Sequence, residues 1–410
     1  MDTASNPLPE DNAQATPLIA RQPIYNTQMG IYGYELLFRP ARGSKSQIQS
    51  AEATAHVLTS AIVGSGLNQL VYHRKAIINV TPAFIHVMPQ IQLPPDQIVL
   101  DVPDNIRVDH GLIESLRELK AKGFEISIGG LATLKDDRII KLADIFRVDV
   151  RKLDVALLDR LTKFLRRFKN LSLRALKIET LAEYDLYREG GYDLFQGYFL
   201  GSPRTAKFRD LSVNKLAIMD LLAAVYDVET SVEQLEEKIA RDVTLSFKLL
   251  RLVNSPFFGV PKEVESVKRA VVLLGRKEVR KLVSLLALSS TSDQPVATVE
   301  IALLRARACE LLGERTNLPS DGFFTVGMFS ALDIILEQPI GHLLSKLPLN
   351  ETIKVAILRR GGVMGQALAC VLAIENGRWS GILFGDLSEA DISAVYRDAL
   401  QWTNGVLGKL

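Results

Sequence analysis

The chain has 410 residues, of which 47% are hydrophobic and 23% charged, and its formal net charge is +2. A chain of this length exceeds one ordinary core, so we expect two domains of a soluble, globular protein. The near-neutral charge gives no reason to expect nucleic acid or a membrane surface as a partner. The sequence has no apolar run near the roughly 18 residues that span a bilayer, no recognisable signal peptide and only two isolated cysteines, which predicts a cytoplasmic protein without a cysteine-based metal or redox centre.

Residues 1–16 are polar, contain proline and show no periodicity, so we expect a disordered tail. Over residues 17–204, short β-rich runs alternate with amphipathic stretches such as 109–123. The β-rich runs lie at 30–38, 75–80, 97–102, 124–128, 145–150 and 171–178. Alternation of this kind predicts βα units and a parallel sheet, and we expect a (β/α) barrel with some elements shortened.

Beyond the barrel region the pattern changes. Residues 205–210 are the expected linker, and from 211 to 410 nearly every segment has the 3.6-residue period of a helix. Ser231 and Gln234 form the sequence pattern of a capping box, and residues 276–290 carry an apolar stripe of helical spacing. The expected fold class is therefore an α/β barrel followed by an all-α domain.

The stretch YGYELLFR (32–39) alternates with a period of two, so Glu35, Leu37 and Arg39 share one face of a strand. We expect the opposite, more apolar face to pack on covering helices and Glu35 and Arg39 to face the barrel mouth. A carboxylate beside a guanidinium suits a metal-bridged phosphodiester, because one binds the cation and the other binds phosphate oxygens. From this stretch alone, a half-exposed strand with an ordinary ion pair is the better-supported interpretation.

The longer segment RQPIYNTQMGIYGYELLFR resembles the opening of EAL domains, barrel phosphodiesterases that act on cyclic di-GMP. Further segments follow in the order of that family, namely INVTP, FRVDVRKLD, LKIET and GGYDLFQGYFLGSP. The likeness spans about residues 18–204, and several ordered motifs are more specific than any single one. It implies a (β/α) barrel whose relatives use two-metal hydrolysis, in which carboxylates hold the cations.

The resemblance also implies which site residues are kept and which are lost. The positions that match or lie near metal ligands of the family are Glu35, Asn79, Asp104 and Glu179. The bridging Asp-Asp pair of the family falls on Gly129-Gly130, a further Glu falls on Leu176, and the Lys that positions the water falls on Arg147. Because a hard divalent cation needs about six oxygen ligands, we expect no metal, no cofactor and no hydrolysis.

A receptor that binds cyclic di-GMP without cleaving it is the alternative function. The side chains that would hold the ligand are Gln22, Glu35, Leu37, Arg39, Arg147 and Gln196. Without metals, the phosphates would be neutralised mainly by Arg39 and Arg147, so ligand binding is the less favoured hypothesis. A third, enzymatic hypothesis needs a different metal set, built from Glu35, Asp104, Asp149 and Glu179.

The second half of the chain resembles HDOD domains, helical relatives of the HD phosphohydrolases. The matching positions are Asp242, Asn254-Ser255, Ala270 and Leu274-Gly275. The likeness is strongest over 213–290, and 327–336 resembles the continuation found in proteins that fuse EAL to HDOD. A metal site of the HD type needs histidine ligands, and His342 is the only histidine of this half, so we expect no metal here either.

The candidate interaction residues of the second domain are Asn254, Ser255, Arg276, Lys277, Arg280 and Lys281. For the first two, hydrogen bonding at a helix end is favoured over a partner groove; for the basic residues, a solvated face is the default. The resemblance as a whole implies a catalytically inactive bacterial signal-transduction protein. It would act through other signalling proteins in cyclic di-GMP-related control of motility or biofilm. The sequence names neither the partner nor the oligomeric state.

Overall fold

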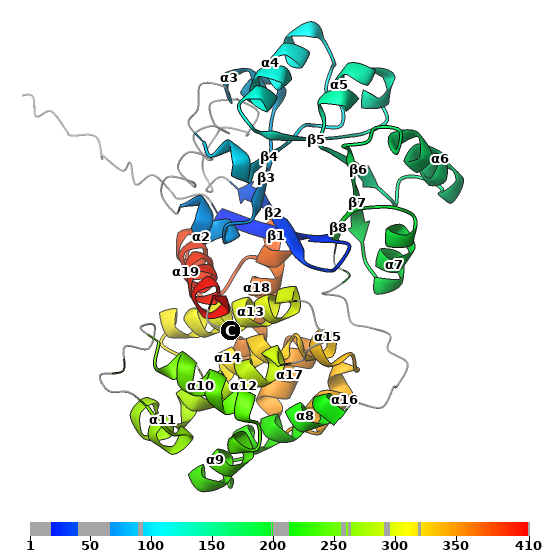
Figure 1. Ribbon diagram of the computed structural model, residues 1–410. Coiled ribbons are helices and arrows are strands. Elements are labelled where there is room, and N and C mark those ends of the chain that lie inside the picture. The colour runs from blue at the N-terminus through cyan, green and yellow to red at the C-terminus, as the bar shows by residue number, and fades with distance from the viewer. Residues whose placement is uncertain are drawn as a thin grey trace, which may run out of the picture.

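The computed structural model describes residues 18–39, 66–88, 93–197, 199, 213–255, 260, 264–290, 296–318 and 321–408. The tail expected at 1–16 and the linker expected at 205–210 lie outside these residues. Within them, strands and helices alternate in the first half of the chain and only helices occur in the second (Figure 1). The predicted fold class, a barrel followed by an all-α region, is therefore confirmed.

The strands form a closed barrel in chain order. They are β1 (Leu18–Asn26), β2 (Ile31–Arg39), β3 (Lys75–Asn79), β4 (Ile98–Asp101), β5 (Glu125–Gly129), β6 (Ile145–Asp149), β7 (Ser172–Ile178) and β8 (Leu194–Gly197). Strand β1 runs antiparallel to both of its neighbours, and the other neighbouring pairs are parallel. The sequence pattern did not single out β1, which carries Arg, Gln and Pro, or β8, which is only four residues long.

Helices cover the outside of the barrel (Figure 1). They are α2 (Leu67–Val71), α3 (Pro82–Val87), α4 (His110–Ala121), α5 (Asp137–Leu142), α6 (Val155–Leu165) and α7 (Leu181–Glu189). Helix α4 shows why these segments fold as the sequence predicts: the Asp109 carboxylate accepts a hydrogen bond from the Leu112 amide and caps the first turn. Its buried residues Leu112, Ile113, Leu116 and Leu119 recur at helical spacing.

A small apolar cluster plugs the barrel interior near the N-terminal ends of the parallel strands. Its buried members are Ile24, Ile77, Val99, Ile145 and Leu194. Every strand that contributes to it alternates inward and outward side chains, so the next inward positions lie nearer the C-terminal ends. Those positions are polar, and they form the candidate site described below.

The second half of the chain is a helical domain. Its helices are α8 (Val213–Tyr226), α9 (Val232–Ala240), α10 (Val243–Val253), α11 (Val267–Leu274), α12 (Arg276–Ser289), α13 (Val296–Arg315), α14 (Asp321–Phe329), α15 (Leu332–Leu336), α16 (Ile340–Ser345), α17 (Glu351–Arg359), α18 (Gly362–Glu375) and α19 (Glu389–Leu407). The predicted capping box is present, since the Ser231 hydroxyl and the Gln234 side chain each accept from the other's backbone amide. The apolar stripe of α12 is buried as predicted.

The two domains pack directly on each other, with α18 and α19 against β1 and α19 against α2 (Figure 1). Buried Arg21 of β1 pairs with Glu300 of α13 at 2.6 Å, and Tyr34 donates a hydrogen bond to the same carboxylate. The amide of Asn404 in α19 donates to the carbonyl of Gln69 at 2.8 Å. Because β1 and β2 are joined by a tight turn instead of a helix, the helical domain supplies the outer layer for this sector of the barrel.

One stretch of the described residues, Glu351–Glu375, is long and apolar enough for a membrane span by length and composition alone. In the structure it is two helices, α17 and α18, broken at Arg360, whose backbone is left-handed with φ 58°. Both helices pack against α14, and α18 also packs against α13 and β1. These contacts are those of core helices in a globular domain.

Candidate functional site

The glycine pair at the end of β5 has no room for side chains. A Cβ atom on Gly129 would lie 2.6 Å from Cγ of Arg147 and 2.8 Å from Oδ1 of Asp104. Gly130 has φ +80°, which favours glycine, and its Cβ would lie 2.7 Å from the Asp104 carbonyl oxygen. Other side chains therefore fill the space next to these two positions.

Arg147 of β6 occupies much of that space. It lies beside Gly129 in the β5–β6 register, and its side chain is only 10% exposed. Its guanidinium donates to Asp101 and to the Val102 carbonyl, and its Nη2 lies 2.7 Å from Oδ1 of Asp104. Burial, together with the neighbouring Arg174 guanidinium, lowers the pKa of Arg147 to about 10. At neutral pH the group still carries its positive charge.

A second guanidinium lies deeper in the barrel. Arg174 of β7 donates from Nη2 to Oδ2 of Asp101 at 2.7 Å, and the two side chains are 1% and 3% exposed. Burial lowers the pKa of Arg174. Its Nε and Nη1 have no hydrogen-bond partner among the described residues. Asp101 thus links two buried guanidiniums inside the barrel.

Sequence reasoning did not single out Asp101 or Arg174. The available signal was a charged residue flanked by apolar ones in each of two β-rich runs: Asp101 in QIVLDV, and Arg174 in LSLRALKI, which also contains Lys177. Buried strand runs of a parallel barrel are expected to be almost wholly apolar. A charge between apolar residues of such a run therefore points to a partner inside the barrel, and Asp101 and Arg174 are partners of each other.

Glu35 of β2 is held by amide groups. Its Oε1 accepts a hydrogen bond from Asn79 Nδ2 at 2.7 Å, and its Oε2 accepts from Gln196 Nε2 at 2.5 Å. Gln196 also donates to Gln22 Oε1 at 2.9 Å. Leu37 is half-buried on the same strand, and the side chain of Arg39 lies outside the described residues. The structure therefore brings Gln22, Glu35, Asn79 and Gln196 into one hydrogen-bonded group.

The remaining carboxylates of the mouth each have a basic partner. Asp149 lies 3.0 Å from the Lys177 ammonium, and Glu179 lies 2.5 Å from the Arg151 guanidinium. Burial raises the pKa of Asp104. Leu176 faces Gln196 across the β7–β8 register and supplies no ligand atom.

These contacts decide whether the metals of EAL enzymes fit this chain. Among the described residues, no three or more His, Cys, Asp or Glu side chains gather where they could hold a metal ion. The carboxylates that surround the mouth are satisfied by guanidinium, ammonium or amide groups of the protein itself. A pair of divalent cations does not fit this arrangement, because the described carboxylates are already paired and Arg147 fills the space beside Gly129.

In the helical domain, Asn254 and Ser255 make hydrogen bonds typical of a helix end. Asn254 donates from Nδ2 to the Val264 carbonyl at 2.9 Å and accepts from the Val264 amide at 2.7 Å. The Ser255 hydroxyl donates to the Leu252 carbonyl at 2.7 Å. The two side chains thus fasten the end of α10 to the segment that precedes α11.

The basic residues of α12 do not form the solvated face that the sequence suggested. Arg276 donates to the backbone carbonyls of Asp227 and Thr230, and Arg280 stacks on the Tyr226 ring at 5.2 Å. Lys281 is ion-paired with Glu278 at 2.7 Å and also with Glu310, whereas Lys277 is exposed. These side chains are covered because α12 packs against α8 and also against α10, α11 and α13, so that neighbouring helices lie on both of its sides.

Comparison with known proteins agrees with these two domains. Residues 214–336 match the family model of the HDOD domain. The second half of the chain thus contains an HDOD domain, and the first half is a barrel with the motif order of EAL domains. The chain thus joins a closed barrel to a helical region that contains an HDOD domain, the order that its motifs predicted.

Two curated relatives match along nearly their whole length. The uncharacterized protein YuxH of Bacillus subtilis is 27% identical over 407 residues, which cover 95% of this chain and 98% of the relative. The cyclic di-GMP phosphodiesterase CdgJ of Vibrio cholerae is 29% identical over 385 residues, which cover 91% of this chain and 88% of the relative.

Two solved structures each resemble under half of the chain. A manganese and cyclic di-GMP complex of Klebsiella pneumoniae BlrP1 is 18% identical with a TM-score of 0.38, covering 47% of this chain and 57% of that one. A standalone EAL protein of Vibrio cholerae in its c-di-GMP-bound form is 21% identical with a TM-score of 0.35, covering 45% and 91%.

Proposed function

We propose that this chain is a catalytically inactive signal-transduction protein of the cytoplasm. It works in cyclic di-GMP-related signalling, controls motility or biofilm formation, and acts by binding other signalling proteins. The observation that carries this proposal is the position of Arg147, whose guanidinium lies beside Gly129 and pairs with Asp101 and Asp104. The name of the relative CdgJ supports the signalling context.

Electrostatics argues against metal-dependent hydrolysis at this site. A divalent cation ~4 Å from one guanidinium would be repelled by about 8 kcal/mol at an effective dielectric constant of about 20. The buried Arg174 guanidinium adds to that repulsion. Asp101 and Asp104 are already paired with Arg147, and Gly129 and Gly130 offer no further ligand, so we expect neither cation of the family's mechanism to be held.

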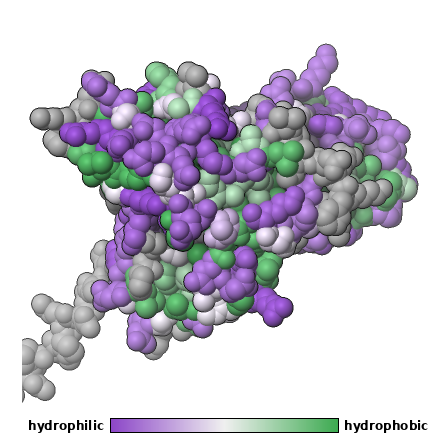
Figure 2. All heavy atoms as spheres, turned by 90° about the horizontal axis from the view of Figure 1, so that it is seen from below, coloured by the Kyte–Doolittle hydropathy of each residue, from purple (hydrophilic) through white to green (hydrophobic). Residues whose placement is uncertain are grey.

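Exposed apolar side chains support the role of protein partners. Phe247 of α10 is 63% exposed and Val272 of α11 is 69% exposed, and the two helices are in contact. Figure 2 views the helical end of the molecule, where apolar patches lie between hydrophilic side chains. Binding of a partner protein would remove these exposed aromatic and branched side chains from water.

An assay of turnover tests the proposal. The purified full-length chain is incubated with cyclic di-GMP and either Mg²⁺ or Mn²⁺, with CdgJ as the positive control. We expect linear dinucleotide to form with CdgJ and not with this chain. Metal-dependent turnover that scales with the concentration of this chain would overturn the proposal.

A cyclic di-GMP receptor is the second candidate function. The observation that favours it is that Nε and Nη1 of Arg174 have no hydrogen-bond partner among the described residues, which leaves cationic donors inside the barrel. The argument against a receptor is that the Arg147 guanidinium is already ion-paired with Asp101 and Asp104 and is not free to bind phosphate. Calorimetric titration separates the two candidates: a receptor gives micromolar binding that Arg39→Ala abolishes, and a flat titration at high protein concentration eliminates the receptor.

A further inference from the structure

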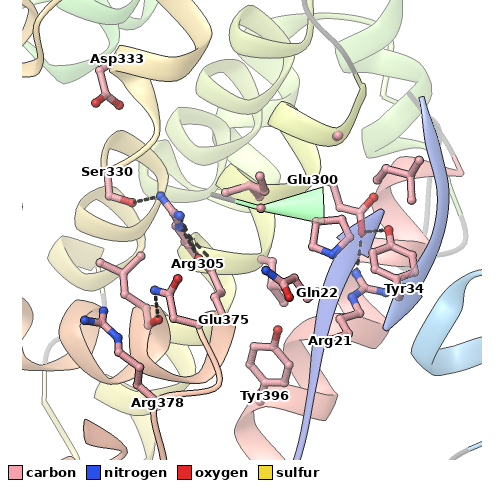
Figure 3. A pocket seen from close by; sticks show the side chains of 18 of the residues that line it. Arg21, Gln22, Tyr34, Glu300, Arg305, Ser330, Asp333, Glu375, Arg378 and Tyr396 are labelled. Atoms are coloured by element: carbon pink, nitrogen blue, oxygen red, sulfur yellow. Dashed lines mark hydrogen bonds and ion pairs between the residues drawn. The ribbon is translucent and has the colours of Figure 1, made fainter. Parts of the chain in front are cut away.

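A cavity of about 540 Å³ lies between the two domains. Its walls come from β1 and β2 of the barrel and from α13, α18 and α19 of the helical domain (Figure 3). The apolar part of the lining includes Tyr25 and Ile31 of the barrel and Ala297, Leu304 and Leu372 of the helical domain. Cavities of about 300–1,000 Å³ at domain boundaries are typical binding sites for small molecules.

Two ion pairs hold the polar walls of the cavity in place. Arg21 pairs with Glu300 at 2.6 Å, and Arg305 grips Glu375 with Nε and Nη2 at 3.0 and 2.8 Å from Oε2. All of these side chains line the cavity, and the dashed contacts in Figure 3 join them in pairs. Because each guanidinium has its own carboxylate, these walls are rigid and contribute no net charge.

Tyr396 of α19 presents an unused polar group to the cavity. The residue is 1% exposed, and its hydroxyl has no hydrogen-bond partner among the described residues. In Figure 3 this hydroxyl points into the cavity, in the direction of Gln22. A buried hydroxyl without a partner costs about 1–3 kcal/mol, and a molecule in the cavity would supply the missing partner.

Four arginines and four carboxylates line the cavity, and ion pairs occupy all of them except Arg360, Arg378 and Asp333 among the described residues. Arg360 and Arg378 line the cavity at its exposed rim, and no carboxylate of the described residues forms an ion pair with either. The one lining carboxylate without an ion pair is Asp333, and burial raises its pKa. Two guanidiniums therefore face at most one negative charge.

We propose that this cavity binds a small organic anion with an aromatic or aliphatic body. The body lies against the apolar walls, the anionic group meets Arg360 and Arg378 at the rim, and a polar atom of the ligand meets the Tyr396 hydroxyl. Since both domains line the cavity, such a ligand would tie them together. The inference goes beyond the signalling role proposed above and does not depend on it.

A pair of matched dyes tests both the body and the charge. The probe is 1-anilinonaphthalene-8-sulfonate, and its neutral analogue N-phenyl-1-naphthylamine lacks only the sulfonate. Fluorescence titration of the native full-length chain is expected to show saturable binding of one sulfonate dye per chain. The double variant Arg360→Gln/Arg378→Gln, at two exposed positions, is expected to raise the dissociation constant of the sulfonate dye about tenfold or more. It should leave the dissociation constant of the neutral dye unchanged.

Two further variants fix the location. Arg359→Gln removes an exposed guanidinium one residue from Arg360 that does not line the cavity, and it should leave the binding of both dyes unchanged. Ile301→Trp fills the cavity from α13 and should abolish the binding of both dyes. The proposal is overturned if the sulfonate dye shows no saturable binding, if Arg360→Gln/Arg378→Gln weakens the two dyes equally or neither, or if folded Ile301→Trp still binds them.

Discussion

Replacing Asp101 by asparagine removes the carboxylate that joins the two buried guanidiniums of the barrel. Asp101 contacts Arg147 through Oδ1 and Arg174 through Oδ2, and it is 3% exposed. In the variant, Arg147 keeps Asp104 and the Val102 carbonyl as partners. Arg174 keeps no carboxylate among the described residues, so its charge is left uncompensated inside the barrel.

The expected cost follows from that uncompensated charge. Breaking a buried ion pair by removing one partner destabilises a protein by about 3–5 kcal/mol. We therefore expect the free energy of unfolding of Asp101→Asn to fall by about 3–5 kcal/mol, measured by urea denaturation with far-ultraviolet circular dichroism. Adding Arg174→Met removes the stranded charge at similar volume, so the double variant should recover much of the loss.

A surface substitution of the same chemistry provides the control. Asp159 forms an exposed ion pair with Lys163 on α6, and Asp159→Asn should change stability by less than about 1 kcal/mol. The reasoning is refuted if Asp101→Asn costs no more than Asp159→Asn. It is also refuted if Arg174→Met, added to Asp101→Asn, destabilises the barrel further.

Three other predictions follow from particular contacts. Gly129→Ala should lose about 1–3 kcal/mol of stability in the same denaturation assay, because the added Cβ would lie 2.6 Å from Cγ of Arg147. Gly341→Ala should not be destabilised, because nothing lies within 4 Å of its added Cβ. Equal effects of the two substitutions would contradict the packing described here. Cys309 and Cys370 are buried, and burial raises the pKa of both thiols. A thiol reagent should therefore label neither cysteine in the native protein and both after unfolding. Rapid labelling of the native protein would contradict this prediction. Hydrogen bonds from Arg138 lower the pKa of Asp136 from 3.8 to about 2. The stability that this carboxylate contributes is therefore present above pH 3.8 and is lost as the pH falls toward 2. Carbon NMR titration of Asp136 measures the midpoint, which Arg138→Gln should raise.

Local patterns were enough to predict most of the barrel. Helix α4 and the strands β2 to β7 lie where alternation and helical spacing placed them, within a residue or two. The periodicity did not predict β1, because polar residues interrupt it, or β8, because it is only four residues long. The antiparallel β1 was also missed, since strand direction follows from how the barrel closes and leaves no trace in the periodicity of a single segment.

The charged interior could be predicted only in part. The resemblance to EAL domains implied that glycines replace the bridging carboxylates and that Arg147 stands where a lysine is expected. It did not show that Arg147 would turn toward Asp101 and Asp104, because those contacts join β6 to β4 and to the segment after it. The basic residues of α12 were misjudged for a similar reason, since their partners lie on other helices.

The central claim is that the Arg147 guanidinium, beside Gly129 and paired with Asp101 and Asp104, leaves no site for a pair of metal ions. Titration of Mn²⁺ into the full-length chain with cyclic di-GMP present, followed by the electron paramagnetic resonance signal of free Mn²⁺, measures this directly. The account predicts a free-metal signal that rises in proportion to the Mn²⁺ added, as it does in buffer. Two tightly bound Mn²⁺ ions per chain would contradict it.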